Sequence, residues 1–197
     1  MKLVAPLVSV LALVALVGLS LGTTAAPARA AAEVYNVDPV HSYVLFKVKH
    51  MDIAYAYGRF NEFSGTISWD AANPAASTIS VEVKTASVDT GNKDRDGHLS
   101  NPDFFNAAQF PTMTFKSTAV KKVDGSHLEV TGDLSLHGKT KSVTFTVEHA
   151  GPITHPRAGT VAGFHAEFPI KRSDFAVGKP EGLGDEVRLT LSLEAKK

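Results

Sequence analysis

The residues of this 197-residue chain most able to carry chemistry are eight histidines spread along the sequence. No two of them stand two or four positions apart, the spacings at which a strand or a helix brings two imidazoles to one metal ion. His50 is the most informative, because it continues the alternating pattern of three inward apolar residues, Val44, Phe46 and Val48. His41 and His98 lie among polar neighbours, where a hydrogen-bonded histidine that holds a loop competes with a ligand contact. The pattern therefore predicts no metal site.

Other catalytic signatures are missing from the sequence. The chain has no cysteine, which excludes disulfides, thiolate metal sites and cysteine nucleophiles. It contains no Gly-x-Ser-x-Gly elbow and no glycine-rich phosphate loop. From the residues alone we predict a protein that is not an enzyme and that needs no cofactor.

The first thirty residues read as a secretory signal peptide. Lys2 precedes an apolar run from Leu3 to Leu21, and a small-residue segment ends in Ala28-Arg29-Ala30. Cleavage is expected after Ala30 or Ala32, which predicts an exported, periplasmic protein; an uncleaved membrane anchor is the alternative. Residues 31–197 then form one domain. This domain keeps 18 basic and 20 acidic residues without a basic cluster, which argues against nucleic-acid binding and against charge-driven recruitment to a membrane.

The elements that must position any site are strands. Strict alternation of apolar and polar residues runs through residues 44–49, 79–84, 128–136, 143–148 and 187–194. Further strands are expected near residues 59–69, 112–123 and 161–172, and Gly58 and Gly65 could mark a bulge or bend. About eight strands joined mostly by short turns indicate an all-β antiparallel barrel or sandwich.

One segment interrupts this rhythm. Residues 89–111 are rich in Gly, Asn and Asp and contain the pair Phe104-Phe105. Asn92 can cap a short helix over residues 93–99, and Ser100 or Asn101 can cap a second one that starts at Pro102. A long crossover with one or two short helices is typical of a lid over a barrel opening.

An eight-stranded barrel can either be filled by its own side chains or hold one elongated ligand. All eleven phenylalanines follow the signal segment, and many lie near strand ends and the crossover. Rigid aromatic walls suit a hydrocarbon chain, but the same residues can simply fill a core. The residues alone leave both readings open.

Several ordered blocks resemble the YceI-like family. They include Tyr35-Asn36-Val37-Asp38-Pro39-Val40-His41-Ser42, Gly58-Arg59-Phe60, Arg95-Asp96-Gly97-His98-Leu99, Pro102-Asp103-Phe104-Phe105 and Lys171-Arg172-Ser173-Asp174-Phe175. The resemblance spans the whole predicted domain. It departs at Ala176, because the family usually has glycine directly after the phenylalanine.

The resemblance implies an eight-stranded antiparallel lipocalin-like barrel that binds a polyisoprenoid or another long-chain amphiphilic lipid, with an isoprenoid quinone as one option. The expected wall combines inward strand positions with family blocks: Val44, Phe46, Val48, Phe60, Phe63, Val81, Phe104, Phe105, Phe115 and Phe164. Four polar residues are expected at the entrance: His41, His50, Arg95 and His98. Transient contact with a membrane or with quinone-using membrane proteins would fit such a carrier. Monomer and homodimer both stay open.

Two functions of other classes compete with the carrier. A metal-assisted periplasmic hydrolase would use the scattered histidines. A packed barrel would bind partners through its loops, and the absence of an internal cavity would favour it.

Overall fold

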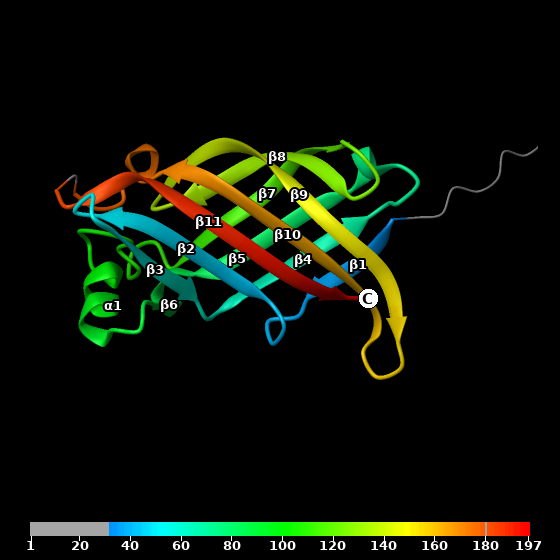
Figure 1. The fold of residues 1–197 in the computed structure, drawn as a ribbon, viewed down its shortest axis with the longest axis horizontal. Coiled ribbons are helices and arrows are strands. Elements are labelled where there is room, and N and C mark those ends of the chain that lie inside the picture. Colours follow the sequence, from blue (N-terminus) through cyan, green and yellow to red (C-terminus); the bar gives the residue numbers. More distant parts are fainter. Residues whose placement is uncertain (1–31, 180) are drawn as a thin grey trace, which may run out of the picture.

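The computed structural model describes residues 32–179 and 181–197, and within them the chain closes into a β-barrel (Figure 1). The ring of hydrogen-bonded neighbours runs β1-β4-β5-β7-β8-β9-β10-β11, and β11 returns to β1 through the pairs Asn36–Lys196 and Val37–Ala195. Every pairing is antiparallel. This closed ring confirms the predicted eight-stranded antiparallel barrel. The predicted signal peptide, residues 1–30, lies outside the described residues.

The strands of this ring have the following bounds: β1 Glu33–Val37, β4 Phe63–Trp69, β5 Thr78–Lys84, β7 Thr112–Lys122, β8 His127–Leu136, β9 Lys139–His155, β10 Gly159–Lys171 and β11 Leu183–Lys196. Three further strands extend the sheet beside β11: β2 Tyr43–His50, β3 Ala54–Phe60 and β6 Val88–Asp89. Three 3-10 turns complete the elements: η1 Pro74–Ala76, η2 Thr85–Ser87 and η3 Arg172–Phe175. No helix in the described part of the chain is long and apolar enough to cross a membrane.

The strand predicted over residues 59–69 is broken in two. β3 ends at Phe60 and β4 begins at Phe63, so the chain bends at the two residues between them. Neither Gly58 nor Gly65 interrupts the strand register, so the prediction of a bulge at these glycines was wrong. Gly58 instead leaves room for the ring of Phe46, which a methyl group at position 58 would overlap.

The crossover between β6 and β7 contains a single α-helix. Helix α1, Lys93–Ser100, begins as predicted at Asn92, whose side-chain oxygen accepts a hydrogen bond from the Arg95 amide at 3.0 Å. The second predicted helix does not form. Residues 101–109 make successive turns instead, closed by backbone bonds such as Phe105 N to Leu99 O. These turns carry Phe104 and Phe105 back toward the barrel.

The interior of the barrel is packed unevenly. Side chains that are completely enclosed, with at most 1% exposure, include Tyr35 on β1, Ile67 on β4, and Leu128 and Val130 on β8. Other residues that pack against the same core are only partly buried, and these include Phe46, Met113, Phe115, Leu189 and Leu191. An apolar side chain that points inward and still has accessible surface borders a void. The barrel therefore has a solid part and a hollow part.

Candidate functional site

The void is a cavity under the crossover. Its volume is about 160 Å³. Thirty residues line it, and 27 of them are apolar. Leu99 from helix α1 and Phe104 and Phe105 from the following turns close it on one side. Val177, just after η3, and Leu183, the first residue of β11, also line it. The hollow interior rules out the solidly packed barrel as a description of this fold.

Nine of the ten predicted wall residues line this cavity: Val44, Phe46, Val48, Phe60, Val81, Phe104, Phe105, Phe115 and Phe164. Strand alternation placed most of them correctly, because β2, β5, β7 and β10 each turn one face inward. Phe63 does not line the cavity. It packs against the core at the start of β4, just after the bend that separates this strand from β3. Whether the nine residues contact a ligand stays a prediction.

Aromatic rings join the crossover to the barrel wall. The Phe60 ring lies 5.6 Å from that of Phe46 and 5.5 Å from that of Phe105, between ring centroids, so one strand residue touches both wall and lid. Deeper in the barrel, Phe145 stacks on Phe168 at 4.0 Å and also meets Phe115. These contacts hold the rings in defined orientations around the void.

Arg172 is the one charged residue of the wall, and the sequence analysis did not select it. It is 7% exposed and donates from Nε, Nη1 and Nη2 to the backbone carbonyls of Gly184, Val177 and Leu183, at 2.9–3.0 Å. No carboxylate in the described ranges lies within ion-pair distance of it. Its nitrogens therefore fasten the chain between η3 and β11, and only its apolar stem is left for the cavity. The signal was present, because position 172 continues the inward parity of Phe168 and Ile170.

The four residues predicted at a polar entrance do not come together, and none of them lines the cavity. His50 is exposed because the β2–β3 hairpin projects beyond the cavity, so parity alone placed it wrongly. Arg95 is also exposed and binds Thr90, with Nε 2.8 Å from the hydroxyl and Nη2 2.8 Å from the carbonyl. His98 packs edge-on against Phe104 at 5.0 Å between ring centroids. His41 lies elsewhere, beside Asp38.

Near His41 the structure contains one group of possible metal ligands among the described residues. Atoms of Asp38, His41 and Glu194 all lie within 4.8 Å of one another. The Asp38 carboxylate is already occupied, because Lys196 Nζ lies 2.6 Å and His41 Nδ1 2.7 Å from its Oδ2. The hydrogen bonds from Lys196 and His41 hold the pKa of Asp38 well below its usual value. An ammonium group thus takes the place that a metal cation would need.

The cavity can bind apolar groups and offers little to a reaction. Besides Arg172, its only polar lining residues are Thr114 and His165, and the His165 side chain is exposed. No carboxylate, serine or cysteine belongs to the described wall. A dry apolar void of about this volume is known to accept a benzene-sized molecule. As it stands, the cavity fits a short hydrocarbon segment.

Comparison with known proteins shows relatives of the same size and fold. The model of the YceI-like domain matches residues 35–195. Protein YceI of Escherichia coli O157:H7 is 43% identical over 163 residues, which cover 81% of this chain and 85% of that protein.

Two solved structures extend this result. Burkholderia cenocepacia BcnA superposes with a TM-score of 0.75 at 31% identity and covers 81% of this chain and 99% of its own. A polyisoprenoid binding domain from Saccharophagus degradans, implicated in plant cell wall breakdown, has a TM-score of 0.62 at 18% identity, over 82% of this chain and 97% of its own, and shares the fold. With the domain match, the identity to protein YceI and the closed barrel in agreement, this chain belongs to the YceI-like family.

Proposed function

We propose that this chain is an exported carrier that holds the tail of a long-chain lipid, a polyisoprenoid or an isoprenoid quinone, inside its barrel. The observation that carries the proposal is the apolar cavity enclosed by Phe46, Phe60, Phe104 and Phe105. A structural neighbour described as a polyisoprenoid binding domain supports the choice of lipid. The apolar run and small-residue site in residues 1–30 support export to the periplasm.

The energetics favour a tail over a polar ligand. Each methylene group moved from water into the barrel contributes about 0.8 kcal/mol, so a few isoprene units offset the cost of immobilising the lipid. The wall has only three polar residues that could orient a head group, Thr114, His165 and Arg172, and the Arg172 guanidinium already donates to three backbone carbonyls. The head group therefore stays at the mouth, and affinity comes from the tail.

A long tail also requires the barrel to open further. The present volume of about 160 Å³ suits a short hydrocarbon segment, so additional isoprene units must displace side chains. Phe104 and Phe105 are suited to this, because they are partly buried and belong to turns rather than to a strand. Loading thus involves movement of the crossover.

The test is to identify the cargo. Protein purified without denaturation from a host with isoprenoid membranes is measured by native mass spectrometry and then extracted with organic solvent. We expect a bound mass that disappears on unfolding and an extract containing an isoprenoid lipid. A protein that carries no lipid and takes up no added isoprenoid quinone refutes the carrier.

Export is tested separately by amino-terminal sequencing of the protein from the periplasmic fraction. The expected first residue is Ala31 or Glu33, corresponding to cleavage after Ala30 or Ala32. Full-length protein held in the membrane fraction would show the anchor instead.

A further inference from the structure

The hairpin of β2 and β3 exposes an unusual group of large apolar side chains. Met51 and Ile53, in its turn, are 62% and 82% exposed. Tyr55 and Tyr57, on the outward side of β3, are 55% and 63% exposed. Isolated exposed apolar residues are common on soluble proteins, but four within seven positions of one hairpin mark an interaction site.

Two lysines complete this surface. In the strand register Lys49 stands opposite Tyr55, and Lys47 stands opposite Tyr57. The ammonium group of Lys47 also lies 5.4 Å from the centre of the Tyr55 ring. Neither lysine has a carboxylate within ion-pair distance in the part of the chain that the structure describes. We call the six residues the docking face: Lys47, Lys49, Met51, Ile53, Tyr55 and Tyr57.

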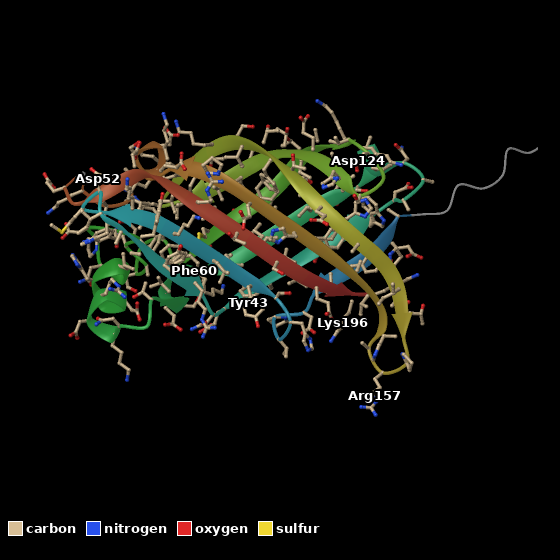
Figure 2. The ribbon with its side chains drawn as sticks, viewed as in Figure 1. Tyr43, Asp52, Phe60, Asp124, Arg157 and Lys196 are labelled. Atoms are coloured by element: carbon tan, nitrogen blue, oxygen red, sulfur yellow. The ribbon has the colours of Figure 1, made fainter. Side chains whose placement is uncertain are left out.

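The docking face lies beside the cavity. The Met51 amide donates to the carbonyl of Gly182 at 2.9 Å, and the next residue, Leu183, lines the cavity and pairs with His50. Figure 2 shows Asp52, at the tip of the hairpin, at the same end of the barrel as helix α1, and Lys196 and Arg157 toward the other end. The tip of the hairpin, with Met51 and Ile53 on either side of Asp52, therefore projects from the end at which the crossover closes the void.

We propose that the docking face binds the surface of a bilayer that contains anionic phospholipids. The chemistry matches that of an interface: the exposed Met51 and Ile53 flank Asp52 at a protruding tip, and tyrosines with an apolar ring and a polar hydroxyl lie behind them. Lys47 and Lys49 stand at the level of the phosphates, and their two positive charges exceed the single negative charge of Asp52. The proposal rests on the proposed function only in taking the bilayer as the source of the cargo. Residues 31–197, with 18 basic and 20 acidic residues, carry a net charge near −2 that provides no long-range attraction, so binding depends on local insertion together with the two lysines.

The bilayer fits this surface better than a protein partner does. Protein interfaces place their anchoring residues in well-packed, water-excluding centres. Met51 and Ile53 instead stand at a convex turn, where Met51 and Asp52 have backbone φ angles of 50° and 58°. Such a tip presents its apolar side chains away from the barrel, the geometry that lets them enter a fluid acyl layer.

The experiment is flotation with vesicles of phosphatidylethanolamine and one quarter phosphatidylglycerol. It uses the chain from residue 32, which retains every strand of the closed barrel. The test variant is Met51→Ser/Ile53→Ser. The matched control is Val123→Ser/Ile153→Ser, which removes two apolar side chains, each 60% exposed, outside the docking face. We expect the test variant to lose roughly tenfold or more in vesicle affinity and the control to bind like the unaltered chain.

A second pair of substitutions tests the contribution of the lysine charges. Lys47→Gln/Lys49→Gln should weaken binding to these vesicles by roughly fivefold per lysine and leave binding to pure phosphatidylcholine unchanged. Circular dichroism identifies any variant that fails to fold. A second measurement follows uptake of farnesol in the absence of vesicles, in which Met51→Ser/Ile53→Ser should match the unaltered chain.

The outcomes separate the two proposals. Vesicle binding without farnesol uptake refutes the carrier and leaves the docking face standing. No vesicle binding by the unaltered chain, or equal binding by test and control variants, overturns the docking face. Sedimentation velocity tests the alternative that the docking face binds a second copy of this chain. If the unaltered chain is a dimer, Met51→Ser/Ile53→Ser is a monomer and vesicle binding is unchanged, the face joins two copies and the bilayer proposal is wrong.

Discussion

Replacing Ala166 by phenylalanine should block the cavity. Ala166 lies on β10 with 4% exposure, lines the void, and pairs across the sheet with Leu191, another wall residue. The added ring has about the size of the benzene molecule that fills a void of about 150 Å³, so most of the 160 Å³ beside it disappears.

The magnitude follows from the carbon atoms displaced. A ring of six carbons excludes about six methylene equivalents of a bound tail, at most about 5 kcal/mol, and about 2 kcal/mol if the tail shifts along the barrel. Affinity for an isoprenoid should therefore fall by roughly 30-fold to several thousandfold. Filling the void should at the same time stabilise the unloaded protein by about 0.5–2 kcal/mol.

The assay combines calorimetric titration with farnesol and urea unfolding without ligand. Glu167→Phe is the control, because it adds the same ring to the exposed face of the same strand. The opposite signs of the two effects make the prediction specific. Unchanged affinity of Ala166→Phe for farnesol would refute a tail in this cavity. Reduced stability would show instead that the surroundings of Ala166 are already full.

Three further predictions concern the stability of the fold. Ala176 has a backbone φ of 54° and an exposed methyl group, so Ala176→Gly should raise the free energy of unfolding in urea by about 0.5–1 kcal/mol, and a decrease would contradict the strain argument. Gly132→Ala would place a methyl group 2.5 Å from a backbone carbonyl oxygen of the neighbouring strand and should cost about 1–3 kcal/mol in the same assay, whereas Gly125→Ala, with nothing within 4 Å, should be nearly neutral. Burial lowers the pKa of the His149 imidazole below its ordinary value of 6.5. As the pH falls, the unfolded chain therefore binds a proton at position 149 before the folded chain does. The stability that neutral His149 provides is complete above pH 6.5 and is lost as the pH falls through and below 6.5. Urea unfolding followed by the fluorescence of Trp69, whose ring lies 4.9 Å from His149, should show this loss between pH 7 and pH 5, and His149→Gln should reduce it.

Local patterns in the sequence predicted the repeating parts of the fold well. Alternation identified the inward faces of β2, β5 and β8, and the cap at Asn92 located the start of helix α1. These signals succeed because each depends on neighbours a few positions away. Closure of the ring depends on pairs such as Val37 with Ala195, which no local pattern specifies.

The errors have physical causes of the same kind. His50 has inward parity, but parity does not say where a cavity ends, and the hairpin continues past it. Pro102 offered a favourable helix start, yet the turns after Asn101 bring two phenylalanines to the barrel, and this packing outweighs the local preference. Arg172 was missed because an inward-pointing arginine contradicts the usual composition of a core. Only the tertiary structure supplies the three backbone carbonyls whose hydrogen bonds offset the cost of burying the Arg172 guanidinium.

The uneven packing of the barrel has a consequence for the life of the protein in the cell. A cargo that fills the hollow part contributes to the folded state by mass action, so loaded molecules unfold less often than empty ones. Proteases act on the transiently opened chain, and empty molecules should therefore be degraded first. The abundance of the protein would then follow the supply of its lipid without any dedicated sensor, because incomplete packing around the cavity under Phe104 and Phe105 already distinguishes the two forms.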